Sequence, residues 1–213
     1  MRATWYFDLI SPYSYLHLKQ FGRLPADLEV EYVPILFAGL LKHYGHKGPA
    51  EIPPKRVYIY RQLVWLAGRL GVPFRLPPAH PFNPIQALRL VLAAGPSREH
   101  VETAFGMVWQ EGRDLQDPNT LEELARRLHI KDTRAVLSDE RIKARLKANT
   151  DMAIAQGVFG VPSFRLGDSL FWGQDSLEMM LDYLRAPSGF DTDEMRRVLT
   201  LPEGTVRKEL AKS

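Results

Sequence analysis

The sequence has 213 residues, of which 45% are hydrophobic and 25% are charged, a globular composition that excludes fibrous proteins and chains without a packed core. Its 28 lysines and arginines only slightly exceed its 25 aspartates and glutamates, and they are spread along the chain, so no basic arm indicates a nucleic-acid partner. The complete lack of cysteine excludes disulfides, thiolate metal sites and dithiol redox chemistry, so a thiol that acts here must come from a ligand.

The chain begins without the apolar core of a signal peptide, and no window reaches the ~18 apolar residues of a membrane helix. We therefore expect a cytoplasmic protein with no membrane partner. Residues 4–10 mix aromatic and β-branched types, which predicts a strand. Ser11 and Pro12 follow at once and predict the start of a helix that ends near Gly22, because serine is a common N-cap and proline suits the first turn. Residues 28–35 predict a second strand, parallel to the first.

Residues 37–156 predict a block of helices. Apolar residues recur there every three or four positions, and proline, glycine and asparagine interrupt the pattern. The clearest predicted helices span residues 54–70, 85–94, 98–111, 120–128 and 139–156.

Strand signals return after Gly157. Residues 162–166 and 169–172 predict a hairpin around a Gly-Asp turn, and residues 175–184 predict an amphipathic helix. This order predicts the α/β class, as a thioredoxin-like fold with a large all-helical insertion. The expected domains are a discontinuous thioredoxin-like domain, residues 1–36 and 157–213, and the insertion, residues 37–156. The tail from residue 186 has a weaker helical pattern over residues 193–199 and no assigned function.

Ser11 stands where a strand meets a helix N-terminus, a place where free backbone N–H groups and the helix dipole stabilise an anion. A plain N-cap would explain Ser11 and Pro12 as well. The Val161–Pro162 pair precedes the returning strand, and in combination with the β-α start it predicts a cis bond before Pro162.

These segments resemble the thioredoxin-like group that contains the disulfide oxidoreductases of the bacterial periplasm, the kappa-class glutathione transferases and 2-hydroxychromene-2-carboxylate isomerase. The chain is most similar to the last of these. The resemblance extends over residues 1 to about 185, and it rests on residues 7–15, 49–55, 157–164 and 171–175.

The resemblance implies that Ser11 is the catalytic residue. Redox members begin the first helix with Cys-x-x-Cys, and Ser11 and Ser14 stand at those two positions here. In glutathione-using members the first of these residues is a serine that donates a hydrogen bond to the sulfur of bound glutathione. Glutathione is therefore the expected cofactor, and a hydroxyl donor at a helix N-terminus would lower the pKa of its thiol from about 8.5 toward neutrality.

The same resemblance implies the remaining glutathione contacts. The backbone of Val161 beside Pro162 would pair with the cysteinyl backbone, Gln174 and Asp175 would hold the γ-glutamyl end, and Lys55 would meet the glycine carboxylate. Asp175 could instead cap a helix, and Lys55 could be a solvated surface charge. His46 stands where the family has asparagine, which makes thiol binding sensitive to pH near 6.5.

Phe37 and Asn83 lie in the helical insertion, which covers the active site in this family, and they are the expected substrate contacts. From its residue type alone, Phe37 is more readily explained as part of an ordinary core. His43 and His46 are three residues apart, but no third ligand completes a set, so we expect no metal.

The function implied by the resemblance is a glutathione-dependent cis-trans isomerase that acts on a small unsaturated aromatic acid, as in the degradation of aromatic compounds. Addition of the thiolate to the conjugated double bond, rotation and elimination would leave glutathione unconsumed. A kappa-class-like glutathione transferase is the alternative enzyme. A redox-inert thioredoxin-like binding module that holds a peptide is the alternative without catalysis. A homodimer is expected from the family.

Overall fold

The computed structural model describes residues 1–204; residues 205–213, which we assigned to the thioredoxin-like domain, lie outside the described part. The chain forms two compact units, Met1–Leu177 and Glu178–Ser213. No described helix is both long and apolar enough to cross a bilayer.

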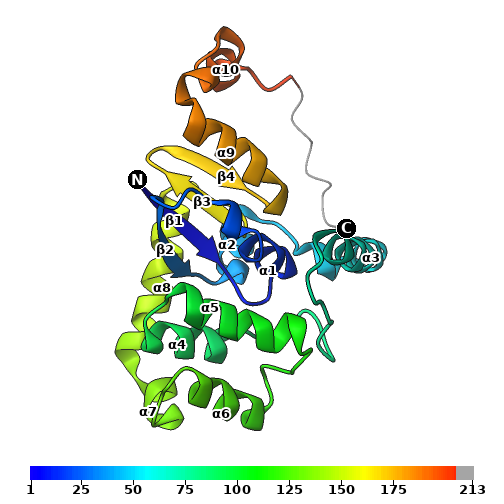
Figure 1. Cartoon of the computed structure of the whole chain (residues 1–213), viewed down its shortest axis with the longest axis vertical. Helices are drawn as coiled ribbons and strands as arrows, with labels where there is room; N and C mark the ends of the chain where they lie inside the picture. Colours follow the sequence, from blue (N-terminus) through cyan, green and yellow to red (C-terminus); the bar gives the residue numbers. More distant parts are fainter. Residues whose placement is uncertain (205–213) are drawn as a thin grey trace, which may run out of the picture. The chain divides into compact units, whose positions relative to one another are not determined.

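The first unit is built on a four-stranded sheet in the order β2-β1-β3-β4 (Figure 1). Strand β1 (Arg2–Phe7) pairs in parallel with β2 (Glu29–Pro34) and antiparallel with β3 (Ser163–Leu166), which pairs antiparallel with β4 (Ser169–Trp172). The predicted β-α-β start and the predicted hairpin after the helical block are therefore confirmed.

Helices occupy each of the five ranges that apolar periodicity predicted within residues 37–156, and two further helices, Phe37–Tyr44 and Thr133–Ser138, were not predicted. The helix α4 (Ile85–Ala94) has the predicted bounds, whereas α5 (Arg98–Phe105) is shorter because a π-helical turn, Gly106–Gln110, replaces its last predicted turns. The short α7 (Thr133–Ser138) begins after its N-cap Asp132 and ends at Asp139, so it is a separate helix from the one that follows. The remaining helices are α1 (Pro12–Leu18), α2 (Phe37–Tyr44), α3 (Pro53–Leu70), α6 (Pro118–Arg127), α8 (Glu140–Ala155), α9 (Leu177–Arg185) and α10 (Asp193–Arg197).

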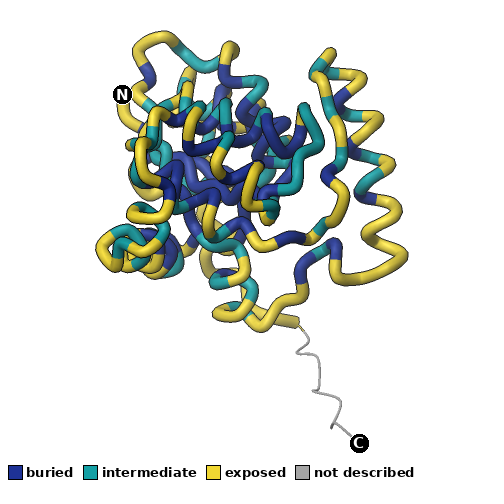
Figure 2. Tube along the Cα trace, turned by 90° about the horizontal axis from the view of Figure 1, so that it is seen from below, coloured by how far each residue is buried: buried dark blue, intermediate teal, exposed yellow. Residues whose placement is uncertain are grey.

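One face of the sheet carries an aromatic core. The indole of Trp5 is fully buried, with its ring centroid 4.9 Å from those of Phe7 and Phe21. Its Nε1 donates to Nδ1 of His17 at 3.2 Å, and burial lowers the pKa of His17 to about 3, so the imidazole is neutral. Phe164 on β3 completes this layer beneath α1. Figure 2 shows the buried positions gathered in the interior of the chain trace.

The other face of the sheet packs against α2 and α8. Tyr6, Leu40 and Val161 belong to the buried cluster there. The hydroxyl of Thr150 on α8 accepts a hydrogen bond from the backbone N–H of Leu36, immediately before α2, at 3.0 Å. A Cβ at Gly39 of α2 would lie only 2.8 Å from Cγ2 of Thr150, so these two helices meet where only glycine leaves room.

Gly39→Ala is expected to lower the free energy of unfolding by about 1–3 kcal/mol, because the added methyl overpacks this contact. The helix propensity of alanine, which is better than that of glycine by about 1 kcal/mol, opposes this cost. Gly68→Ala is the matched control, since that glycine lies within α3 and a Cβ there meets nothing within 4 Å. Urea denaturation should show opposite signs for the two variants, and a stabilised Gly39→Ala protein would contradict the proposed contact.

The second unit is small. The Tyr183 and Phe190 rings meet edge-on with centroids 5.4 Å apart, and the side chain of Thr192 caps the N-terminus of α10.

Candidate functional site

The register of the sheet brings distant loops to one end of it. Phe7 pairs with Pro34, so β1 and β2 end together. Tyr6 pairs with Ser163, where β3 begins, and Ser163 pairs with Trp172, where β4 ends. This end of the sheet therefore gathers Ser11, Phe37, Val161, Pro162, Gln174 and Asp175, each within five residues of a strand terminus.

Ser11 is the N-cap of α1 and is 8% exposed. Its Oγ accepts a hydrogen bond from the backbone N–H of Ser14 at 3.2 Å, and its own N–H donates to the carbonyl of Asp8 at 3.0 Å. The capping interpretation of Ser11 is thus correct as far as it goes. An N-cap serine uses only a lone pair of its oxygen, so the hydroxyl hydrogen stays available for a ligand.

Asp8 is a buried acid that the sequence analysis did not single out. Its carboxylate accepts hydrogen bonds from the backbone N–H of Ile10 at 3.1 Å and of Phe37 at 2.8 Å. Burial raises the pKa of Asp8 to about 7, and these two backbone hydrogen bonds only partly oppose the shift. Asp8 therefore joins the loop before Ser11 to the start of α2. An aspartate directly after an apolar strand was the available signal.

Two further side chains hold the loop before Ser11 from the helical insertion. The indole Nε1 of Trp109, in the π-helical turn, donates to the carbonyl of Leu9 at 2.8 Å. The Nε2 of His80 lies 2.9 Å from the carbonyl of Ile10, and its Nδ1 lies 2.8 Å from the hydroxyl of Tyr60. Burial lowers the pKa of His80. These contacts join residues about 70 and 100 positions apart, and no local sequence signal reports them.

The loop before β3 presents a free backbone edge. The Val161–Pro162 bond is cis, and the carbonyl of Pro162 accepts from the N–H of Gly173 at 2.9 Å. Val161 is 8% exposed, and within residues 1–204 neither its backbone N–H nor its C=O takes part in a hydrogen bond. Buried backbone groups are nearly always paired, so this edge is suited to an extended peptide-like ligand.

Gln174 and Asp175 lie in a 3-10 turn directly after β4. The Oε1 of Gln174 accepts from Nε2 of Gln20 at 3.3 Å, which brings the turn against the end of α1. Burial and then the negative charges of Tyr58 and Asp175 raise the pKa of Tyr13, so Asp175 acts on the first turn of α1. The Asp175 carboxylate lies against Gly173, where a Cβ would be 2.5 Å from Oδ1. Among residues 1–204 the Asp175 carboxylate takes part in no hydrogen bond or ion pair, and Gly173, not Asp175, is the N-cap of this turn, so the carboxylate is available to a ligand.

The other expected site residues are less closely connected. Phe37 is half-buried against the Tyr6 cluster, and its N–H is held by Asp8. Lys55 is exposed and lies seven residues, or two helical turns, before Gln62 on α3. His46 follows the C-cap of α2 and is exposed. The Oδ1 of Asn83 accepts from the N–H of Ile85 at the start of α4, so its carbonyl has a capping role.

Across residues 1–204 no three histidine, aspartate or glutamate side chains lie close enough to share a metal ion.

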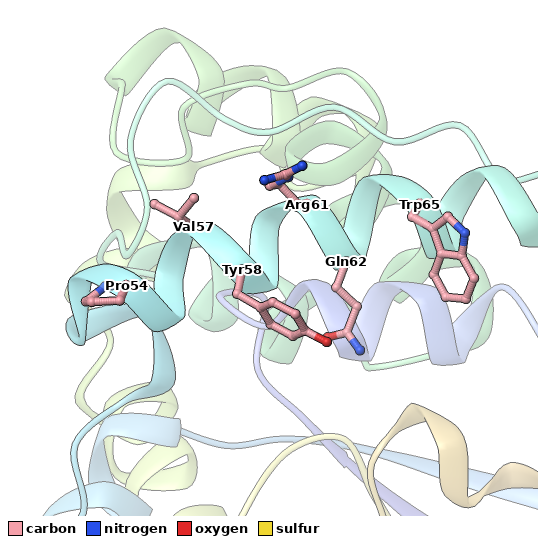
Figure 3. A pocket seen from close by; sticks show the side chains of 6 residues that line it. All are labelled: Pro54, Val57, Tyr58, Arg61, Gln62 and Trp65. Atoms are coloured by element: carbon pink, nitrogen blue, oxygen red, sulfur yellow. The ribbon is translucent and has the colours of Figure 1, made fainter.

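A hollow opens along α3, next to the first turn of α1. It has a volume of about 620 Å³ and is lined by Pro54, Val57, Tyr58, Arg61, Gln62 and Trp65 (Figure 3). The hydroxyl of Tyr13 donates to Oε1 of Gln62 at 2.7 Å, which places the hollow two residues from Ser11. The substrate contacts expected from the sequence, Phe37 and Asn83, do not line this hollow, although the aromatic residues of α3 recur at helical spacing.

The residues of this site lie within the part of the chain that is similar to known proteins. The family model of the DSBA-like thioredoxin domain matches residues 4–185. Glutathione S-transferase kappa 2 of Caenorhabditis elegans is 31% identical over 208 residues, which covers 87% of this chain and 92% of that protein. The 2-hydroxychromene-2-carboxylate isomerase of Pseudomonas putida is 30% identical over 188 residues, covering 84% and 92%. A solved 2-hydroxychromene-2-carboxylate isomerase structure matches with a TM-score of 0.79 and 27% identity, covering 91% of this chain and 99% of that one.

Proposed function

Because the chain belongs to the family of DSBA-like thioredoxin domains and is an enzyme of that family, we propose that it uses glutathione as a cofactor held by Ser11. Its relatives include proteins named as a glutathione transferase and as an isomerase. The chain has no cysteine, so it cannot exchange a dithiol for a disulfide. The observation that carries the proposal is Ser11 at the N-cap of α1, with a hydroxyl hydrogen that no contact within residues 1–204 uses.

The residues at this end of the sheet fit a small thiol peptide. Ser11 can donate to the sulfur, and the positive end of the α1 dipole favours its charged form. The unpaired backbone of Val161, beside Pro162, offers one N–H and one C=O to an extended backbone. Gln174 and the Asp175 carboxylate suit the amino end of the γ-glutamyl group, Lys55 suits a terminal carboxylate, and His46 is a possible additional donor.

The proposed reaction is a cis-trans isomerisation of an unsaturated aromatic acid. When bound, glutathione supplies a thiolate that adds to the conjugated double bond and later leaves, so that rotation occurs between the two events. Ser11 would stabilise the charged sulfur by donating a hydrogen bond to it, both before addition and again after elimination. Lys55, His46 and the amide of Asn83 are the available donors for oxygen atoms of the substrate on which negative charge develops. In this proposal the thioredoxin-like domain, residues 1–36 and 157–213, supplies most of the contacts to the thiol, and the insertion, residues 37–156, adds Lys55 and His46 to them and binds the substrate.

Two alternatives share this site. A kappa-class-like transferase would use the same thiolate and release a conjugate. A redox-inert binding module would use the Val161 edge to hold a peptide without any reaction. The 31% identity to a kappa transferase favours the first of these alternatives.

Product analysis separates the three functions. Purified protein is incubated with reduced glutathione and 2-hydroxychromene-2-carboxylate, and both compounds are followed by chromatography. We expect conversion of the acid that requires glutathione while the glutathione concentration stays constant. A fall in glutathione that matches the conjugate formed would favour the transferase. No turnover of either the acid or an electrophilic acceptor would favour the binding module, and conversion that needs no thiol would contradict the proposed cofactor.

The proposal also implies a place and an assembly. Reduced glutathione is abundant in the cytoplasm, so a cytoplasmic role in the breakdown of aromatic compounds is part of the proposal. A homodimer is proposed from the resemblance alone, and sedimentation equilibrium at micromolar concentration would test it.

A further inference from the structure

The helix α3 carries positive charge and has no acidic residue of its own. Lys55, Arg56, Arg61 and Arg69 lie among its 18 residues. Among the residues that the structure describes, none of these four cations forms an ion pair, whereas Arg127 on α6 is paired with both Glu111 and Glu123. The helix therefore presents an uncompensated positive surface, which attracts anions.

The same helix also exposes large apolar side chains. Tyr58 is 66% exposed, Trp65 is 60% exposed and Val57 is 58% exposed. Figure 2 shows α3 as exposed along most of its turns. Exposed apolar surface gains free energy when a ligand covers it, in proportion to the apolar area removed from water.

The charged and the aromatic groups meet in the hollow described above. Arg61 lies between Tyr58 and Trp65 along the helix, three residues from one and four from the other, so all three share one face. The guanidinium of Arg69 lies 5.5 Å from the ring centroid of Trp65, so it adds positive charge at the far end. Figure 3 shows Tyr58, Gln62 and Trp65 on the side of α3 that faces α1, with Arg61 on the adjoining side.

We propose that this hollow binds the substrate as an aromatic carboxylate, with Arg61 on the carboxylate and with Tyr58 and Trp65 against the ring. The inference rests on the proposed function and names the residues that select its substrate. The volume of about 620 Å³ suits one small molecule. A second copy of the chain is a less favourable occupant of the hollow, because a two-fold contact through α3 would bring its positive charges against those of the other copy. The hydrogen bond from Tyr13 to Gln62 places the ligand beside the turn that begins with Ser11.

Binding can be measured without any thiol, so the test does not depend on catalysis. The probes are trans-cinnamate and its uncharged amide, and equilibrium dialysis gives their dissociation constants on the intact chain. Cinnamate should bind saturably, and Arg61→Gln should weaken it about tenfold, the value of one charge-assisted hydrogen-bonded pair. The amide should bind more weakly and should not respond to Arg61→Gln. Trp65→Ala should weaken both probes by about fivefold.

Arg56→Gln is the matched control. It removes the same charge from the same helix. Arg56, however, does not line the hollow. Burial raises the pKa of Tyr60 and lowers the pKa of His80, and the charge of Arg56 opposes the first shift and adds to the second. We expect this variant to stay within twofold of the unmodified protein. Equal weakening by Arg56→Gln and Arg61→Gln would show only a long-range charge effect and would overturn the proposal, as would the absence of cinnamate binding.

The two proposals fail separately. If cinnamate binds through Arg61 but the protein never binds glutathione, the proposed substrate site is correct and the proposed function is wrong. If glutathione binds as a thiolate but Arg61→Gln leaves the dissociation constant of cinnamate unchanged, the proposed function stands and the substrate binds elsewhere. Both arginines are exposed, so circular dichroism should confirm that the variants keep their fold.

Discussion

Reduced glutathione added to the protein at pH 7 is expected to give a saturable thiolate absorbance in the ultraviolet, and Ser11→Ala is expected to abolish it. A free thiol with a pKa of about 8.5 is only a few per cent ionised at that pH. Ser11 would stabilise the thiolate through its free hydroxyl hydrogen, and the N–H of Ser14 that donates to the same oxygen polarises this hydroxyl further. Without the hydroxyl, the thiol pKa should rise by about 1–2 units, so the absorbance returns only toward pH 9.

Ser14→Ala is the control for this experiment. The Ser14 side chain is fully buried, and its Oγ has no hydrogen-bond partner in the part of the chain that the structure describes. Alanine keeps the backbone N–H that Ser11 Oγ accepts, so the α1 cap remains intact. The thiolate signal should survive in Ser14→Ala. Equal signals in the Ser11→Ala and unmodified proteins would refute a role for Ser11, and loss of signal in both variants would point to damage of the helix start.

Asp8→Asn is expected to destabilise the protein by about 3 kcal/mol at pH 5 and by much less at pH 8. Both carboxylate oxygens of Asp8 accept backbone N–H groups, from Ile10 and from Phe37. The amide of asparagine has only one accepting oxygen, so its NH₂ group would face a backbone donor in a buried place. Leaving such groups unsatisfied costs about 1–3 kcal/mol each.

The pH dependence follows from the direction of the pKa shift. Burial raises the pKa of Asp8 from 3.8 to about 7 in the folded protein. Between these values the folded state holds a proton that the unfolded state releases, so stability contributed by Asp8 falls as pH rises and is lost above about 7. Each pH unit in this window is worth about 1.4 kcal/mol. Asparagine does not titrate, and the stability difference between the two proteins should therefore shrink by about 3 kcal/mol from pH 5 to pH 8.

Urea denaturation of both proteins at pH 5, 6, 7 and 8 measures this difference directly. Other titrating groups affect both proteins alike and cancel in the comparison. Parallel pH profiles would mean that Asp8 has the same pKa in the folded and unfolded states, and they would refute the buried-acid interpretation.

Local patterns predicted most of the fold. Alternating and aromatic runs located all four strands, and apolar periodicity gave α4 its observed bounds. The thioredoxin-like α/β fold with its helical insertion is confirmed by the family match and by the solved isomerase structure. The prediction was wrong at the end of α5, where the backbone changes to a π-helical turn that lets the Trp109 indole reach the carbonyl of Leu9. That contact is tertiary, and helical periodicity does not contain it.

The site was predictable where backbone position matters and less so where side chains meet across the fold. Ser11 and Val161 have local signals, a capping serine and a proline before a strand, and register brings their loops to the same end of the sheet. His80 has no such signal, and the place of Asp8 directly after an apolar strand marks the residue but not its partners, because the partners of each are backbone groups of other segments. The exposed face of α3 was missed for another reason. Its aromatic spacing is that of any amphipathic helix, and only the structure shows that this face is not covered.

The connection between β2 and β3 has a consequence for biosynthesis. β1 pairs with β2 after a short crossover, but its other edge must wait for β3, which is about 130 residues further along the chain. At roughly 5–20 residues per second, the ribosome leaves that edge open for about 10 s. An open strand edge is a template for pairing with other chains. Nascent chains arrested before residue 163 should therefore bind chaperones, and released full-length chains should not.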